Sequence, residues 1–335
     1  MSFDQILGQD WAISLLKKNL MEGRLSQAYL FYGPQGIGKK QAGYAMAQVL
    51  LCPQRLQDSP CGHCPSCQKF SNQGHSDFHA IEVGDEAVKI DAIRSLLKRL
   101  SLKPMEGGHT VVLIDNVENM TESASNALLK TLEEPPPSVV FILITASHEQ
   151  ILPTILSRCQ KIPFQPLGLE VIQRILIRQE GWTKDHIDSV IPLADGSVGR
   201  ALQFSPEIKN EFRRDFFSFL GQLPKVSFVE IQKWAENLSQ DEENYPYIFL
   251  LIQTWVRDAL LLKMVPQNAC LIHPDLLTLD LIPKRDIQSF FRDTSLTLET
   301  EHAIEQNANK QLAFERLFLR FGASDEQKIL HHDGY

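Results

Sequence analysis

The segment YLFYGPQGIGKKQAG contains the residue types of a phosphate-binding loop. Such a loop has a glycine, four residues, Gly-Lys and then Ser or Thr. Its backbone N–H groups hold phosphate, and the Ser or Thr hydroxyl binds Mg²⁺. Gly33, Gly38 and Lys39 match the pattern, with Gly36 between them, but the next residue is Lys40. Because an ammonium has no lone pair for a cation, the sequence predicts a nucleotide-site shape without its usual magnesium ligand.

A second position that an ATPase needs is also changed. Hydrolysis uses an acidic pair after a buried strand, one carboxylate for the metal ion and one to activate water. The segment VVLIDNVENM provides Asp115, but Asn116 follows it, and an amide is a poor base. Glu118 has the wrong spacing to replace it and is interpreted as a solvated carboxylate at a helix start. We expect the loop to persist without ATP hydrolysis by this chain alone; the alternative is a glycine-rich turn that never bound phosphate.

Four of the six cysteines follow the loop with the spacing C-x8-C-x2-C-x2-C: Cys52, Cys61, Cys64 and Cys67. Thiolates two residues apart can bind one tetrahedral ion across a tight turn, and four of them leave no open position for water. We therefore predict a structural Zn²⁺ site rather than disulfides, since a reducing compartment is expected for this chain. His63 is the alternative fourth ligand if Cys52 lies too far away.

The composition sets limits on the compartment and on the partners. The chain has 335 residues, of which 43% are hydrophobic and 22% charged, as in ordinary globular proteins. No apolar run approaches the ~20 residues that cross a bilayer, and the N-terminus does not resemble a signal peptide, so we expect a cytoplasmic protein without membrane contact. The net charge of −8 argues against binding nucleic acid through the overall field of the chain.

The elements that must position these residues change along the chain. Apolar runs such as AYLFYG, TVVLID and VVFILITA alternate with helical stretches and are typical of strands buried on both faces of a parallel sheet. They predict an α/β domain over residues 1–166, with the cysteine module at 52–67. Amphipathic segments then predict a small helical domain over 167–207. Long helical patterns predict an all-helical domain over 208–335.

Two segments, SNALLKTLEEPP and ILSRCQ, resemble bacterial clamp-loader subunits of the AAA+ class. That family shares the cysteine module directly after the phosphate-loop helix. The resemblance runs from ILGQDWAISLLKKNL through DGSVGRAL to NANKQLAFERLFLRF, which covers nearly the whole chain. It implies an AAA+ P-loop domain, a helical lid domain and a helical collar for oligomerisation. The implied function is to help load the sliding clamp of DNA polymerase III onto primed DNA during replication.

The family contains motor subunits and subunits with a degenerate nucleotide site. The gamma/tau motor has Thr after the loop lysine and Asp-Glu after the third strand, so Lys40 and Asn116 favour the second kind. The end of the chain soon after ERLFLRF favours it too. The resemblance implies the gamma/tau and delta subunits, the sliding clamp and, through the ring, primed DNA as partners. Structural Zn²⁺ is the implied cofactor, and no Mg²⁺-dependent ATP chemistry is expected at the chain's own loop.

Two arginines complete the implied site. The arginine of ILSRCQ, Arg158, corresponds to a residue that enters the ATP site of a neighbouring subunit, where a guanidinium stabilises charge on the transferred phosphoryl group. It is therefore expected to act in trans; the alternative is an arginine at a strand entrance paired with a carboxylate. Arg200, in GSVGRAL, matches a sensor arginine, or simply pairs with a carboxylate at the domain junction. The residues assigned to the degenerate nucleotide site are Gly33, Gly36, Gly38, Lys39, Asp115 and Arg200.

Two other functions stay open on this sequence. One is a divergent gamma/tau motor that still hydrolyses ATP, and turnover by the isolated chain distinguishes it. The other is a stand-alone, zinc-containing AAA+ interaction protein, and co-purification with clamp-loader subunits distinguishes that one.

Overall fold

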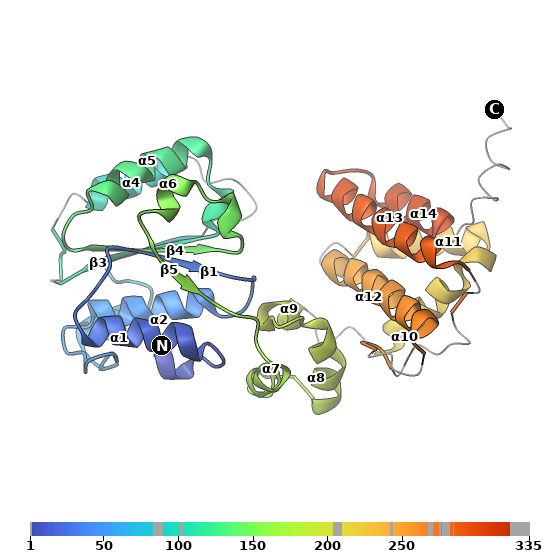
Figure 1. Cartoon of the computed structure of the whole chain (residues 1–335), viewed down its shortest axis with the longest axis horizontal. Helices are drawn as coiled ribbons and strands as arrows, with labels where there is room; N and C mark the ends of the chain where they lie inside the picture. Colours follow the sequence, from blue (N-terminus) through green and yellow to red (C-terminus); the bar gives the residue numbers. More distant parts are fainter. Residues whose placement is uncertain are drawn as a thin grey trace. The chain divides into compact units, whose positions relative to one another are not determined.

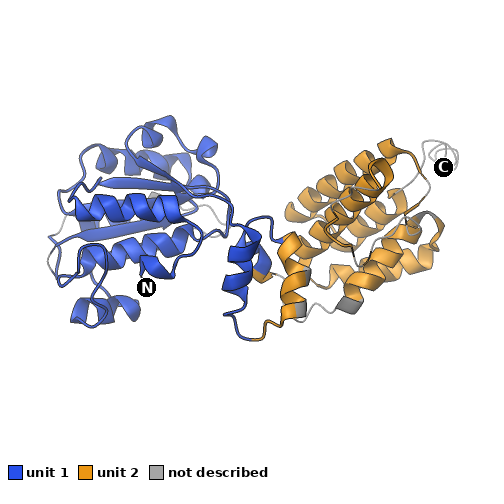
Figure 2. Ribbon diagram, turned by 60° about the horizontal axis from the view of Figure 1, so that its bottom comes forward, with its two compact units in different colours: residues 1–180, 194–201 blue, residues 181–193, 202–335 orange. Residues whose placement is uncertain are grey.

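The chain forms two compact units (Figure 2), the first comprising Met1–Glu180 with Ala194–Ala201 and the second Gly181–Leu193 with Leu202–Tyr335. Each unit buries its own set of apolar side chains. The computed structural model describes residues 2–82, 90–100, 103–106, 108–203, 210–241, 244–266, 271–274, 276, 282–283 and 285–321.

A five-stranded sheet forms the centre of the first unit, in the order β2-β3-β4-β1-β5, and every neighbouring pair is parallel. The side chains of β4 are all buried, and so are most of those of β1 and β3, which explains the Val, Ile, Leu and Phe runs in these strands. The predicted α/β fold with a parallel sheet is therefore confirmed. The strands are β1 (Ala28–Tyr32), β2 (Phe78–Glu82), β3 (Thr110–Asp115), β4 (Val139–Thr145) and β5 (Gln160–Pro163).

Helices cover both faces of this sheet (Figure 1), with α1 and α2 on one face and α4, α5 and α6 on the other. Successive strand side chains alternate between these layers, so Phe31 packs in one core cluster and Leu30 in the other. Gly43 lets α2 lie directly on the sheet, because a Cβ there would stand 2.6 Å from Leu113 Cδ1. The helices are α1 (Asp10–Met21), α2 (Lys39–Leu51), α4 (Ile90–Leu100), α5 (Glu122–Glu133) and α6 (Pro153–Leu156).

Shorter elements complete the chain up to residue 203, and those within residues 181–193 belong to the second unit. Cys64 caps α3 (Pro65–Ser71), and the helices predicted after the last strand are present. The predicted domain limits at 166 and 207 remain predictions. The shorter elements are η1 (Phe3–Gln5), η2 (Val117–Asn119), η3 (His148–Gln150), α7 (Leu169–Leu176), α8 (Lys184–Val190), η4 (Ile191–Leu193) and α9 (Val198–Gln203).

The second unit has helices and connecting loops, and no strand, in its described residues. Its core is built largely from aromatic rings, among them Phe216, Trp255, Phe314 and Phe318, all fully buried. No helix in the described part of the chain is both long and apolar enough to span a bilayer. The longer helices are α10 (Asn210–Gln222), α11 (Phe228–Ser239), α12 (Tyr245–Met264), α13 (Ile287–Glu305) and α14 (Lys310–Arg320), with η5 (Leu223–Lys225) after α10.

Candidate functional site

The glycine-rich loop connects β1 to α2 and depends on glycine for geometric reasons. Gly33, Gly36 and Gly38 have φ angles of 139°, 73° and 101°, in the left-handed region. A Cβ on Gly33 would stand 2.3 Å from the Phe164 carbonyl oxygen, and one on Gly36 would stand 2.4 Å from Ser197 Oγ. The loop therefore has the predicted backbone shape, with the start of α2 directly behind it.

Lys39, the loop lysine, is turned into the loop. Its Nζ donates to the carbonyl oxygens of Gly33 and Pro34, at 2.6 Å each, and the residue is only 6% exposed. Burial lowers the pKa of Lys39 to about 8, against the opposing effect of the Asp115 and Glu118 carboxylates. The ammonium is thus held against the backbone of the glycine-rich loop by two carbonyl oxygens.

Lys40 follows the loop lysine, where the phosphate-loop pattern has Ser or Thr, and it contacts Asp115, the carboxylate that the pattern assigns to the metal ion. Its Nζ lies 3.7 Å from Asp115 Oδ2. The other oxygen of Asp115 accepts a hydrogen bond from the Asn116 N–H at 3.1 Å. A divalent cation at this carboxylate would meet a like charge and would lack the hydroxyl ligand, so the residues present do not fit Mg²⁺.

Glu118 differs from its interpretation as a solvated carboxylate. It does lie in the first turn of η2, but it is half-buried, and its Oε1 accepts from the Ala146 N–H at 2.8 Å, just after β4. The local sequence around Glu118 shows the start of a helix. It does not show that the end of β4, with Ala146, lies beside it. Through this hydrogen bond, Glu118 connects the segment after β3 to the segment after β4, at the same end of the sheet.

The start of α9 lies on the glycine-rich loop. Ser197 Oγ donates to the Gln35 carbonyl oxygen at 2.7 Å, and the Gly199 N–H donates to the Gly36 carbonyl oxygen at 2.8 Å. Arg200, the predicted sensor, pairs with Asp195 at 3.2 Å. The carboxylate partner in the alternative interpretation is thus present, and the loop is held by contacts that do not require a nucleotide.

The four cysteines of the module come together. Cys52 Sγ lies 3.6 Å from Cys61 Sγ and 3.9 Å from Cys64 Sγ, and all four sulfur atoms lie within 4.8 Å of one another. Although desolvation opposes it, backbone N–H groups lower the pKa of Cys61 to about 6. The ring Nδ1 of His63 lies instead 2.8 Å from the Cys61 carbonyl oxygen. The four thiols are placed to bind one metal ion, and the histidine is not needed.

Arg158 follows α6 and has a defined orientation. Its Nη2 lies 2.7 Å from Glu133 Oε1, and its Nη1 donates to the Thr154 carbonyl oxygen at 2.8 Å. Its side chain is 33% exposed, so the guanidinium remains accessible. The carboxylate partner that the alternative interpretation of Arg158 expects is therefore present, and it is Glu133, within the motif SNALLKTLEEPP. The sequence did not show which carboxylate this would be.

The sheet separates Arg158 from the loop of the same chain. β1 and β5 run parallel, with Tyr29 opposite Gln160 and Tyr32 opposite Pro163. The loop follows the carboxyl end of β1, whereas Arg158 precedes the amino end of β5. Because a strand residue advances about 3.3 Å, the two lie at opposite ends of the sheet. Arg158 therefore cannot reach a ligand in its own loop.

Comparison with known proteins identifies relatives of this chain. The family described as "DNA polymerase III, delta subunit" matches residues 8–168. DNA polymerase III subunit delta' of Bacillus subtilis is 28% identical over 322 residues, covering 93% of this chain and 95% of that protein. The gamma/tau subunit of Mycobacterium bovis is 36% identical over 227 residues, covering 66% of this chain but 37% of that protein.

The solved structures that this chain resembles have lower sequence identity to it. A gamma subunit-related protein of Thermotoga maritima has a TM-score of 0.49 at 18% identity, covering 92% of this chain and 99% of that one. The Thermotoga maritima RuvB Holliday junction branch migration motor has a TM-score of 0.43 at 16% identity, covering 71% of this chain and 84% of that one.

Proposed function

The chain is a relative of the bacterial DNA polymerase III subunits delta' and gamma/tau, and from this premise we propose that it is a clamp-loader subunit of the delta' type. In this function it assembles with gamma/tau and delta subunits in the cytoplasm and helps to load the sliding clamp onto primed DNA. The match to delta' covers 93% of this chain and the match to gamma/tau covers 66% of it, which supports the delta' type over gamma/tau.

The observation that carries the proposal is the contact of Lys40 with Asp115. The Lys40 Nζ, 3.7 Å from Asp115 Oδ2, brings a positive charge to the carboxylate that would hold Mg²⁺. Asn116 follows without a carboxylate to activate water. Two defects at independent steps, metal binding and proton abstraction, are a stronger argument against turnover than either alone. The loop then serves as architecture in a subunit that does not hydrolyse ATP by itself.

Arg158 is proposed to contribute to ATP hydrolysis on a neighbouring subunit. A planar guanidinium offers a fork of donors that spans phosphate oxygens and stabilises developing negative charge. Its place at the amino ends of the strands, away from the chain's own loop, supports a role in trans. The pairing with Glu133 fits the alternative interpretation equally well, whereas the exposure of one third of the side chain is what leaves Arg158 available to a neighbouring subunit.

The cysteine module is proposed to bind one structural Zn²⁺. Zn–S bonds of about 2.3 Å place the sulfur atoms of a tetrahedral site ~3.8 Å apart. The separations of Cys52 Sγ from Cys61 Sγ and Cys64 Sγ, 3.6 and 3.9 Å, fit that geometry. Zn²⁺ held by Cys52, Cys61, Cys64 and Cys67 would join the end of α2 to the start of α3 and would leave no position for a reacting water.

Metal analysis tests the module. We expect about one zinc per chain in reduced, freshly purified protein, and none after Cys64→Ser. Cys159→Ser is the matched control, because Cys159 lies outside the group of four cysteines. Zinc-free wild-type protein, or zinc retained in full by Cys64→Ser, would contradict the assignment.

ATP turnover by the isolated chain tests the functional class. We expect no DNA-stimulated hydrolysis above background while a gamma/tau motor is active in a parallel assay. Turnover at the rate of the motor would instead support the gamma/tau alternative. Mixing the chain with gamma/tau and delta subunits should give a stable complex by size exclusion; failure to assemble would favour the stand-alone interaction protein.

A further inference from the structure

The outer edge of β2 is open in the described structure. β2 stands at one end of the strand order and pairs only with β3. Ala80, in the middle of the strand, is exposed although the inner strands of the sheet are buried. An unpaired strand edge presents a row of backbone donors and acceptors to which another strand can bind.

The register shows which backbone groups face outward. The Asp77 carbonyl oxygen accepts from the Val111 N–H at 2.9 Å, so the odd-numbered residues of β2 bond to β3. In a parallel pair, alternate residues point their backbone groups to opposite sides, and Ala80 therefore directs both its N–H and its C=O away from the sheet. Among the described residues, no segment outside the sheet bonds to the backbone of Ala80.

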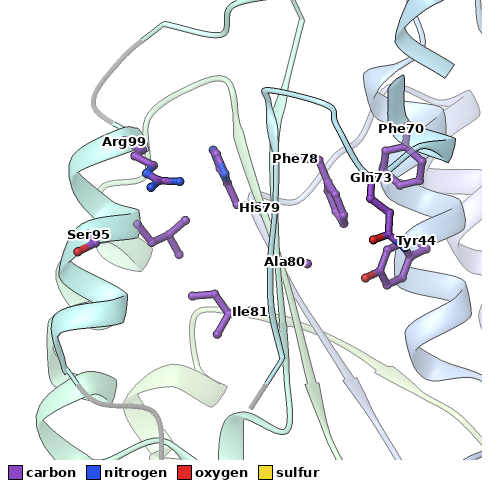
Figure 3. A pocket seen from close by; sticks show the side chains of 10 residues that line it. Tyr44, Phe70, Gln73, Phe78, His79, Ala80, Ile81, Ser95 and Arg99 are labelled. Carbon is purple, nitrogen blue, oxygen red and sulfur yellow. The ribbon is translucent and has the colours of Figure 1, made fainter. Parts of the chain in front are cut away.

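A pocket of about 650 Å³ surrounds this edge (Figure 3). On one face of β2, the ring centroid of Phe78 lies 5.4 Å from the ring centroid of Tyr44 and 4.8 Å from that of Phe70. On the other face, His79 and Ile81 point toward α4. The pocket is thus lined from both sides of one strand, which is the arrangement an added strand with alternating side chains requires.

The two faces of the pocket differ in charge. The first is aromatic, whereas the second carries Arg99, which is exposed and is the one charged residue among the described residues that line the pocket. Burial and the nearby Arg99 lower the pKa of His79, so this ring is neutral at pH 7. The two oxygens of Asp77, which precedes β2, accept from the Met105 and Glu106 N–H groups at 2.8 and 2.9 Å.

We propose that β2 binds an extended peptide segment of a partner protein, which adds to the sheet as a sixth strand. The backbone of Ala80 supplies the pairing. An aromatic side chain of the segment packs against Phe78 and Phe70, and the carboxylate of the adjacent residue meets Arg99, because adjacent residues of a strand point to opposite faces. This surface is distinct from the loop and from Arg158, so the proposal does not depend on the clamp-loader assignment.

Two fluorescent peptides added to the full chain test the proposal. Acetyl-Thr-Phe-Glu-Val-Thr-amide places its aromatic ring and its carboxylate on opposite faces, and acetyl-Thr-Phe-Val-Glu-Thr-amide places them on the same face. Fluorescence polarisation should show the first to bind at least about tenfold more tightly. Equal binding of the two, or tighter binding of AMP, which also joins an aromatic ring to an anion, would overturn the proposal.

Variants test separately the contribution of the Ala80 backbone and that of the Arg99 charge to peptide binding. Ala80→Pro removes the outward N–H, which bonds to nothing in β3, and should abolish binding of the first peptide, whereas Ala80→Ser keeps it. Arg99→Glu should weaken binding by about tenfold, while Lys98→Glu, the same charge change one residue earlier on α4, should not. Slower hydrogen exchange of the Ala80 amide on adding the peptide to wild-type protein checks the pairing without a variant. Unchanged exchange, or unchanged binding by Ala80→Pro, would contradict it.

Discussion

The two ends of the sheet differ in the side chains that they carry. At the carboxyl ends of the strands, Lys40 and Asn116 stand where an ATPase has a hydroxyl and a carboxylate. At the amino ends, Arg158 has a defined orientation and a partly exposed side chain. Contacts within the chain account for the loop glycines, because a Cβ on Gly33 or Gly36 would clash with Phe164 or Ser197. Packing alone therefore gives a reason for glycine at these positions, whether or not a nucleotide binds.

The largest expected effect on stability tests whether the chain's own packing requires glycine in the loop. Gly33→Ala forces a Cβ to within 2.3 Å of a backbone oxygen at a φ of 139°, so it should lower the free energy of unfolding by about 2–3 kcal/mol. Gly168→Ala is the matched control, since a Cβ there would meet nothing within 4 Å and the φ of Gly168 is −66°. Urea denaturation measures both, and equal stabilities would break the packing argument.

A smaller effect is expected from the residue that orients Arg158. Glu133→Ala should lower DNA-stimulated ATP hydrolysis of the reconstituted ring severalfold, because the guanidinium loses its carboxylate partner while its charge remains. Stability should change by less than about 1 kcal/mol, since the pair is exposed. Glu134→Ala tests the same helix end and should leave turnover unchanged. If Glu134→Ala has the effect and Glu133→Ala does not, the proposed orientation of Arg158 is wrong.

Restoring one residue of the loop should have a still smaller effect. Lys40→Thr removes the ammonium from Asp115 and should strengthen Mg²⁺-dependent ATP binding by less than about tenfold. It should not create turnover, because Asn116 still supplies no base. Calorimetric titration with and without Mg²⁺, followed by a turnover assay, gives both answers. ATP hydrolysis by Lys40→Thr alone would show that Asn116 does not prevent turnover. The double variant Lys40→Thr with Asn116→Glu is assayed beside it for comparison.

The last prediction concerns the pH dependence of stability. Burial holds the pKa of Lys39 at about 8 in the folded chain, below the value of 10.5 for a free side chain. Between these two values the unfolded chain binds more protons, so this lysine makes the free energy of unfolding rise with pH from about 8 to 10.5. Lys39→Met should remove that rise and leave stability below pH 7 without a new pH dependence. Parallel slopes for the two proteins would mean that Lys39 is not buried as described.

Much of this could be predicted from the sequence, and the rest depends on contacts between distant segments. Apolar runs predicted the parallel sheet, and spacing predicted that four cysteines meet. Spacing could not show that Glu118 bonds to Ala146, 28 residues away, or that Glu133 pairs with Arg158, 25 residues away. The order of the strands, which makes β2 an edge, is likewise set by packing and has no local pattern.

The central claim is that this chain contributes to ATP hydrolysis through the amino ends of its strands and not through its own loop. Steady-state ATPase rates of rings reconstituted with Arg158→Ala or with Lys39→Ala test it, after size exclusion has shown normal assembly. Arginines supplied to a neighbouring site contribute ~10³ to 10⁵ in rate where they act. We therefore expect Arg158→Ala to remove the turnover of the one site it faces, and Lys39→Ala to leave the total rate unchanged. A normal rate with Arg158→Ala together with a loss from Lys39→Ala would contradict the account.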